Sequence, residues 1–417
     1  MARGDIITGL DIGSTTIRVA VGQMNPHDND LHIIGAAEHP AEGINKGVVT
    51  SIEDAVASIS GALDKVERMT GMPIERAYVS VNGSHVLSQD SHGVVAVSKA
   101  DGEIREDDVQ RAIEAAQTVA TPPNYEILHV IPRQFQVDNQ AGVKDPVGMT
   151  GIKLEVDAQI ILGLTSQIKN LTKCVYRTGT DIQDLVLGVL AVSEAVLTKR
   201  QKELGVALVN MGGLTTSLMV FEEGDVIHTK ILPIGSGHIT NDIAIGLRTS
   251  VDVAEVIKDK FGTALPEDVG KHEEIDLREI DPNENSRVSR KEVAEIIEAR
   301  LEEMFTMVNK ELKSINRHGM LPAGIVLTGG GAKLTGIIDV AKKQFSLPAA
   351  VGTARKFKTA IDKIEDPVFA TALGLVVWGQ NLNSQGNTGG GLASLARFSA
   401  VGDATNKMKK WFKSLLP

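Results

Sequence analysis

One pattern occurs twice in this chain, and it limits the possible folds more than any other feature. Residues 6–22 contain an apolar strand, a turn that carries Asp11 and Gly13, and a second apolar strand. Residues 206–220 repeat this order, and Asn210 stands 199 positions after Asp11. A single Gly/Ser/Thr turn is common in ordinary β-hairpins. Its recurrence at about half the chain length predicts two related domains.

The turns have the composition of a phosphate-binding backbone. Gly13 has no side chain to block a close approach, and successive backbone N–H groups form a concavity that binds anions. A carboxylate such as Asp11 can hold a water molecule of a bound Mg²⁺ ion. Two such turns that face each other would enclose a nucleotide. A purely structural hairpin is the alternative for either turn alone.

A third glycine cluster follows a short apolar strand at residues 324–328. Gly329, Gly330 and Gly331 come directly after this strand, and residues 332–344 have the pattern of a helix. Glycines between a strand and a helix let a nucleotide lie against bare backbone and the helix N-terminus. The alternative is a flexible connector between the two elements.

Length and composition indicate a soluble protein of several domains. A chain of 417 residues is too long for one ordinary core. Cys174 is the single cysteine, which permits no intramolecular disulfide and suggests a reducing compartment. The first residues are polar and lack the build of a signal peptide. No run of 18 apolar residues occurs, so we expect no membrane-spanning helix.

The charge is divided unevenly along the chain. The net charge is −10, yet the residues after position 396 include five basic residues and one acidic residue. An acidic body argues against nucleic-acid binding, and a basic tail points to a partner of its own.

The end of the chain has two parts. Residues 381–406 begin with a Gly/Asn/Ser-rich stretch typical of a flexible linker. The following segment, residues 407–417, places its apolar residues at helical spacing on one face and its lysines mostly on the other; the residues concerned are Met408, Lys409, Lys410, Trp411, Phe412, Lys413, Leu415 and Leu416. A basic amphipathic helix of this kind favours an anionic membrane surface. Docking on the body or in a groove of a partner is the alternative.

The three glycine motifs together resemble those of the actin/Hsp70/sugar-kinase superfamily. They read Asp11-Ile-Gly-Ser-Thr-Thr, Asn210-Met-Gly-Gly-Leu-Thr-Thr and Leu327-Thr-Gly-Gly-Gly-Ala. Residues 232–244 and 254–258 further resemble the FtsA family of actin-like cell-division proteins, and the resemblance extends over essentially the whole chain. It implies an α/β fold with duplicated actin-like (ribonuclease H-like) domains around a nucleotide cleft and an inserted α+β subdomain.

The resemblance also implies a division into subdomains. Subdomain 1A would comprise residues 1–81, 164–200 and 366–380, and the inserted subdomain 1C residues 82–163. Subdomain 2A would comprise residues 201–228 and 316–365, and subdomain 2B residues 229–315. Within 2B we expect the acidic stretch 267–287 to be a solvated loop and residues 289–312 to form a helix. The histidines lack metal-ligand spacing, and we assign them no chemistry.

By the same resemblance the cofactors are ATP and Mg²⁺. The implied nucleotide-binding residues are Asp11, Gly13, Ser14, Thr15, Thr16, Asn210, Gly212, Gly213, Thr215, Thr216, Gly235, Gly237, Glu255, Lys258, Gly329, Gly330, Gly331 and Lys333. Asp11 would hold Mg²⁺ through water. Glu255 and Lys258 lie one helical turn apart, where a solvated charge pair is the alternative reading.

The second phosphate motif departs from the superfamily pattern. Most members begin this motif with an aspartate, where this chain has Asn210, and Leu214 replaces a usual glycine. An amide accepts no proton and does not balance the charge of Mg²⁺, which phosphoryl transfer requires. Glu194 stands where relatives keep a residue that orients water. We therefore expect ATP·Mg binding with slow or negligible hydrolysis.

The expected function is that of an actin-like, ATP-binding membrane tether in cell division. It would polymerise with itself, lie at the cytoplasmic face of the cell membrane at the division site, and bind the C-terminal tail of the tubulin homologue FtsZ, besides other division proteins. Arg300 and Glu303 are the candidates for that tail, and ordinary surface charges are the alternative. Rival functions are a small-molecule phosphotransferase of the same superfamily and an actin-like binding protein of pilus assembly. An Hsp70-like chaperone is disfavoured, because no substrate-binding domain follows residue 380.

Overall fold

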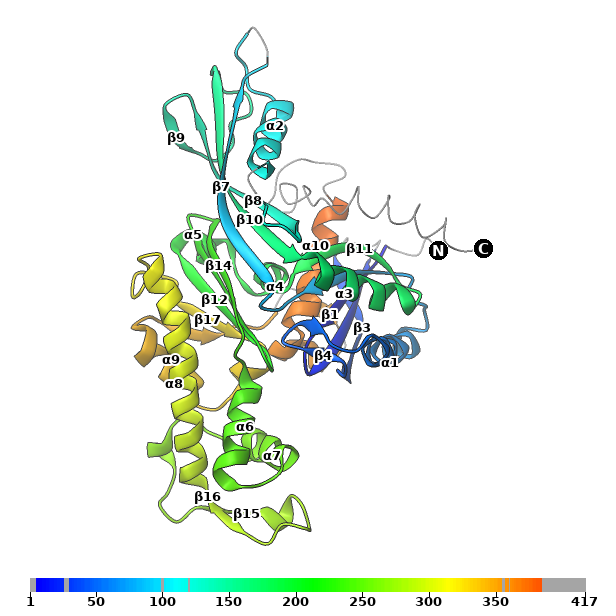
Figure 1. Cartoon of the computed structure of the whole chain (residues 1–417), viewed down its shortest axis with the longest axis vertical. Coiled ribbons are helices and arrows are strands. Elements are labelled where there is room, and N and C mark those ends of the chain that lie inside the picture. The colour runs from blue at the N-terminus through cyan, green and yellow to red at the C-terminus, as the bar shows by residue number, and fades with distance from the viewer. Residues whose placement is uncertain are drawn as a thin grey trace.

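The computed structural model describes residues 5–25, 30–98, 101–118, 121–354, 357–359 and 361–384. Two mixed sheets lie in the middle of the molecule, with a smaller sheet above them and a helical lobe below, as oriented in Figure 1. None of the described helices has the length and apolarity needed to cross a membrane. The segment 407–417 and all but the first residues of the expected linker lie outside the described residues.

The two central sheets have the same topology. In the first, the strand order is β11-β6-β1-β2-β3, with β19 added at the outer side of β3; in the second it is β18-β17-β12-β13-β14. In each sheet the first three strands along the chain are antiparallel, and the remaining two run parallel to the first strand. This equivalence confirms the duplicated α/β fold that the repeated motif predicts.

The strand bounds agree with the apolar runs of the sequence. The first sheet contains β1 (Ile6–Ile12), β2 (Thr16–Met24), β3 (Leu31–Pro40), β6 (Arg76–Val81), β11 (Asp181–Leu187) and β19 (Lys358–Thr359). The second contains β12 (Val206–Met211), β13 (Thr216–Glu222), β14 (Asp225–Leu232), β17 (Ile325–Thr328) and β18 (Ala349–Val351). Strands β1 and β12 are buried along almost their whole length, as parallel central strands require.

The inserted segment forms a four-stranded antiparallel sheet with its own core. Its order is β7 (Val86–Ala96), β10 (Lys153–Leu164), β8 (Tyr125–Val137) and β9 (Gln140–Val143), and α2 (Glu106–Gln117) packs against β7 and β10. Ile113, Leu154 and Val156 are fully buried there. The sequence pattern of residues 93–98 indicates a short strand, and β7 begins before it, at Val86.

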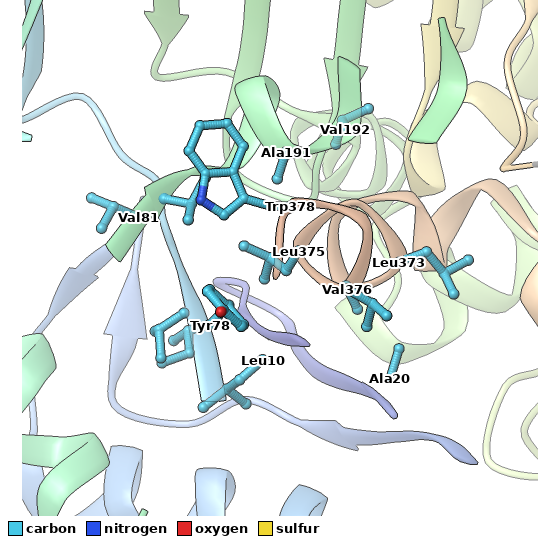
Figure 2. Close-up of a cluster of buried hydrophobic side chains, with 14 of the residues drawn as sticks. Leu10, Ala20, Tyr78, Val81, Ala191, Val192, Leu373, Leu375, Val376 and Trp378 are labelled. Carbon is cyan, nitrogen blue, oxygen red and sulfur yellow. The ribbon is translucent and has the colours of Figure 1, made fainter. Parts of the chain in front are cut away.

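Helix α10 (Ala370–Ser384) is the central element of the first domain. Its residues from Ala370 to Trp378 are all buried, and the missing side chain of Gly374 permits a close contact with α4. A Cβ on Gly374 would lie 2.2 Å from the carbonyl oxygen of Ala191, and one on Gly9 would lie 2.2 Å from that of Ala372. Figure 2 shows the apolar side chains of α10 between the sheet and the helix that carries Ala191 and Val192.

The other helices cover the sheets or form the lower lobe. Around the first domain lie α1 (Ile52–Thr70), α3 (Thr165–Arg177), α4 (Gly188–Val196) and the short hairpin of β4 (Ile44–Asn45) and β5 (Val48–Val49). The second domain and lobe contain α5 (Lys199–Leu204), α6 (Ser236–Leu247), α7 (Val251–Phe261), α8 (Arg290–Ser314), α9 (Ile337–Phe345), β15 (Glu274–Asp276) and β16 (Arg287–Ser289). Ser51 caps α1 by accepting from the Asp54 amide, and Gly71 ends it at a φ of 68°.

Four sequence expectations need correction. The helix expected at 332–344 is a 3-10 turn at Gly330–Lys333 followed by α9, because Gly336 adopts a φ of 79° between them. The acidic stretch 267–287 contains β15 and buries Ile275 and Leu277, so it is not wholly a solvated loop. The apolar run 185–189 indicates a strand, but β11 ends at Leu187 and helix α4 begins at Gly188. Helix α10 continues to Ser384, so the linker does not begin at residue 381.

Candidate functional site: a two-sided cleft

The repeated turns face each other across the cleft between the two domains. The β1–β2 turn presents Thr15, and the β12–β13 turn presents Gly213. A Cβ on Gly213 would lie 2.5 Å from Cγ2 of Thr15, so the two turns are in direct contact. A cavity of about 800 Å³ opens beside them. A second, smaller cavity of about 70 Å³ shares several of its wall residues, Thr15 and Gly213 among them.

The cavities bring together most of the residues that the sequence predicted. The larger one is lined by Thr15, Thr16, Gly212, Gly213, Gly237, Glu255, Lys258, Gly330, Gly331 and Lys333. The smaller one adds Asp11, Gly13, Ser14, Asn210, Thr215 and Gly329. These residues come from both halves of the chain. The strand ends of the two equivalent sheets carry the turns, and α6 and α7 carry Gly237, Glu255 and Lys258.

Two predicted residues support the cleft from behind. Thr216 lines neither cavity, and its buried hydroxyl donates to the carbonyl oxygen of Ile234 at 2.8 Å. Gly235 also lines neither cavity; a Cβ there would lie 2.4 Å from the carbonyl oxygen of Gly212. Both residues therefore fix the path of the chain into α6, whose first residues, Ser236 and Gly237, line the larger cavity.

Glu194 is not at the cleft, contrary to the sequence-based expectation. It lies on the second turn of α4 and lines neither cavity. Its Oε1 accepts a hydrogen bond from Nζ of Lys202 at 2.7 Å. Counting residues back from Asn210 did not reveal that α4 turns this side chain toward α5 instead of toward the phosphate turns.

Asp11 is held at the base of the smaller cavity. Its Oδ1 accepts from the Ser80 hydroxyl at 2.7 Å and from Nδ2 of Asn82 at 3.4 Å. Burial raises the pKa of this carboxyl, and the hydrogen bond from Ser80, the charge of Arg18 and the hydrogen bond from Asn82 oppose that rise. Asp11 is the one carboxylate among the described residues that line the smaller cavity.

A charged and hydroxyl-bearing cluster lies at the other end of the larger cavity. Nζ of Lys258 donates to Oε2 of Glu255 at 2.7 Å and to the Thr240 hydroxyl at 2.9 Å, and Thr240 also donates to Glu255. Lys258 is almost fully buried, while half of the Glu255 side chain is exposed. Lys333 is bound to Asp366 at 2.6 Å. The helical spacing of Glu255 and Lys258 thus predicted the contact between them. It did not indicate Thr240, whose hydroxyl is their third partner.

Sequence reasoning missed a cation and two polar residues of the first domain. Arg18 lines both cavities and pairs with Glu38 at 3.2 Å. Ser80 and Asn82 lie at the end of β6, the parallel neighbour of β1. The carboxyl ends of adjacent parallel strands meet at one edge of a sheet, where open α/β folds bind ligands. The position of Ser80 and Asn82 at the end of a strand was therefore the signal that could have identified them as site residues.

No group of three or more described His, Cys, Asp or Glu side chains could hold a metal ion unaided. The chemistry of the smaller cavity still fits Mg²⁺ in another way. A single carboxylate can hold this ion when water and the phosphates of a nucleotide complete its coordination. The site therefore suits a Mg²⁺ ion that binds together with the phosphates of a nucleotide.

Sequence comparison then decides the family. The family described as "Cell division protein FtsA" matches residues 207–374, and the "SHS2 domain inserted in FTSA" matches residues 83–162. Cell division protein FtsA of Pseudomonas aeruginosa is 38% identical over 383 residues, which cover 92% of this chain and 91% of the relative. The chain belongs to the FtsA family. FtsA of Bacillus subtilis is 39% identical over 376 residues, 90% of this chain and 84% of that protein. FtsA of Escherichia coli K12 is 32% identical over 388 residues, which cover 91% of this chain and 92% of that protein.

Solved structures share the fold at low sequence identity. The PilM-PilN type IV pilus biogenesis complex has a TM-score of 0.66 at 14% identity and covers 89% of this chain and 98% of its own. MreB5 of Spiroplasma citri bound to ADP has a TM-score of 0.54 at 14% identity, and the match covers 92% of this chain and 99% of the MreB5 chain. These likenesses establish the actin-like fold of this FtsA family member. The sequence relatives, and not the pilus protein, establish its family and its place among cell-division proteins.

Proposed function

We propose that this FtsA family member binds ATP·Mg in the cleft and hydrolyses it slowly or not at all. The observation that carries the proposal is the contact of Thr15 with Gly213, which places two phosphate-type turns on opposite sides of one cavity. MreB5, which shares the fold, has been solved with ADP and with AMPPNP. Asp11 would hold hydrated Mg²⁺, and the Glu255–Lys258 cluster would lie by the nucleoside.

Slow hydrolysis follows from the wall of the smaller cavity. Asn210 lies where a second carboxylate would stand, and Glu194 is bound to Lys202 outside both cavities. The described wall thus offers no second acid or base to orient an attacking water. The same argument disfavours the small-molecule phosphotransferase, which needs a catalytic carboxylate here.

Calorimetry and phosphate release test this function together. We expect ATP to bind more tightly with Mg²⁺ than with EDTA, and Asp11→Ala to remove that difference. We expect phosphate release far below the typical enzyme turnover of about 10 s⁻¹. Rapid turnover by the purified protein, or phosphorylation of a small molecule in a coupled assay, would overturn the proposal.

We further propose that the chain forms actin-like filaments with itself and anchors them, through residues 407–417, to the cytoplasmic face of the membrane at the division site. The support is the pattern of Trp411, Phe412 and the flanking lysines, each lysine adding about 1 kcal/mol near an anionic surface. Trp411→Glu should abolish flotation with anionic vesicles. Phe398→Glu, the same change of charge outside this segment, should not. Equal flotation of both variants would refute the anchor.

The lower lobe is the proposed receptor for the FtsZ C-terminal tail. Arg300 on α8 binds both carboxylate oxygens of Asp242 on α6, Nη2 lying 2.9 Å from Oδ1, and it also pairs with the exposed Glu303. We expect Arg300→Glu to weaken binding of an FtsZ-tail peptide, and Lys310→Glu, on the same helix, to leave it intact. Because Arg300 also joins α6 to α8, Asp242→Asn separates loss of this strut from loss of the peptide contact.

A further inference from the structure

We propose that Ser80 and Asn82 are positioning residues that occupy one oxygen of Asp11 and so leave its other oxygen for the hydrated magnesium ion of a bound nucleotide. This inference rests on the proposed nucleotide function. It assigns a role to two side chains at the end of β6 that are not among the expected nucleotide-binding residues and that contact the first phosphate motif at Ile12 and Asp11.

The hydrogen bonds around Asp11 are one-sided. Its Oδ1 accepts from Ser80 at 2.7 Å and from Asn82 at 3.4 Å, whereas its Oδ2 accepts no hydrogen bond from the described residues. Asp11 lies in the wall of the smaller cavity, and Oδ2 is not one of the buried side-chain atoms that lack a partner, so this oxygen is open to the cavity. Water or the hydrated cation of a bound nucleotide can therefore reach Oδ2 at the phosphate turns.

Ser80 is itself fixed from three sides. Its hydroxyl oxygen accepts from the backbone N–H of Ile12 at 3.0 Å and from Nδ2 of Asn82 at 3.1 Å, while its proton goes to Asp11. The Ser80 hydroxyl therefore has one orientation available to it. It restricts the rotation of the Asp11 carboxylate in a way that a mobile surface hydroxyl could not.

The second half of the chain lacks this arrangement. In the duplicated topology Asn210 corresponds to Asp11, and it pairs in register with Thr328, the counterpart of Ser80. The Thr328 hydroxyl is buried and has no hydrogen-bond partner among the described residues. Gly330 stands at the position of Asn82. The first half of the chain, which carries Asp11, thus also carries the two side chains that donate hydrogen bonds to it.

The test compares ATP affinity with Mg²⁺ and with EDTA in the full chain by calorimetry. Ser80→Ala should reduce the gain from Mg²⁺ roughly tenfold, the effect of losing one hydrogen bond to a charged group, and should leave the affinity in EDTA unchanged. Ser80→Thr keeps a hydroxyl at this position and should retain the gain from Mg²⁺. Asn82→Ala should cause a smaller loss in the same direction, since its contact is longer.

The matched control is Ser58→Ala. The Ser58 hydroxyl is buried and likewise accepts from a backbone N–H, that of Glu42 at 2.9 Å, but it lies on α1, outside both cavities. This variant should bind ATP as the wild type does. If Ser80→Ala fails to fold, Asn82→Ala, a change at a half-buried side chain, carries the test.

Two results would overturn the inference. One is an unchanged gain from Mg²⁺ in Ser80→Ala and Asn82→Ala. The other is an equal loss of affinity with and without Mg²⁺, which would mean that Ser80 only supports the fold. A wild-type chain that binds no ATP under either condition would instead refute the proposed nucleotide function, so the two failures are distinguishable.

Discussion

The two halves of the cleft differ at one equivalent position, where the first has a carboxylate and the second an amide. Asp11 and Asn210 occupy equivalent places on β1 and β12, yet only the first has a carboxylate, and only the first has Ser80 and Asn82 beside it. Glu194, which could have supplied a second acid, is instead one partner of an ion pair with Lys202.

The first prediction concerns that ion pair. Glu194→Ala should lower the free energy of unfolding by about 2–3 kcal/mol, because the almost buried Lys202 would lose its carboxylate. It should leave phosphate release unchanged. Urea unfolding and a phosphate assay measure both. Glu203→Ala, an exposed carboxylate on the same short helix as Lys202, is the control and should alter neither.

The second prediction concerns Asp184, which accepts from Nε1 of Trp378 at 3.0 Å. Burial raises the pKa of this carboxyl to about 6 from its usual 3.8. The folded state therefore holds a proton that the unfolded state releases, and the contribution of Asp184 to stability falls as the pH rises from about 4 to about 6. Asp184→Asn removes this term.

Over that pH range the stability of Asp184→Asn relative to the wild type should rise by up to about 3 kcal/mol. Urea unfolding of both proteins at about pH 3.5 and about pH 7.5, on either side of the transition, measures the change. A stability difference that is the same at both pH values would contradict the assignment.

At the scale of elements, the insert is fastened to the edge strand of the second domain by side chains. Arg133 on β8 donates to the carbonyl oxygens of Val226 and Ile227, each at 2.9 Å, and Ser88 on β7 donates to that of Thr229 at 2.8 Å. These bonds satisfy backbone groups of β14 that an open sheet edge would expose.

Arg133→Ala should therefore loosen the contact between β8 and β14. We expect faster hydrogen exchange in β14 and a lower midpoint of thermal unfolding, since two charge-assisted hydrogen bonds are lost. Arg105→Ala removes an arginine of the same insert that pairs only with exposed carboxylates, and it should change neither quantity. Unaltered exchange in the Arg133 variant would show that the fastening is redundant.

Most elements were predictable from the sequence, and the failures share a cause. The helical spacing of apolar residues in 52–66 and the repeated strands around Asp11 and Asn210 are local signals, and α1 and the two hairpins agree with them. The 3-10 turn before α9 and the course of α4 past Glu194 depend on contacts between distant segments. The same holds for Ser80, whose role depends on β6 lying beside β1, a neighbour 68 positions away along the chain from Ile12.

At the scale of the whole molecule, the close approach of the two domains depends on Gly213, which has no Cβ and so lets the two turns touch. Gly213→Ala would bring a Cβ to 2.5 Å from Cγ2 of Thr15, so the Thr15 side chain or the turn that carries it must shift. We expect a wider cleft in small-angle scattering and weaker ATP binding. Adding Thr15→Ala removes the methyl and hydroxyl that collide and should restore the closed form. A compact Gly213→Ala variant would contradict the contact.

The position of α10 has a consequence for synthesis of the protein on the ribosome. The helix that fills the core beneath β1, β2 and β6 begins 289 residues after the end of β6, the last of these strands (Figure 2). Until it emerges, Leu10, Ala20 and Tyr78 lack their main apolar neighbours, so the first domain to be translated cannot be the first to complete its core. The second domain takes all its strands from residues 206–351 and can close earlier. A nascent chain would thus fold in the reverse of its domain order, with Trp378 reporting the last step.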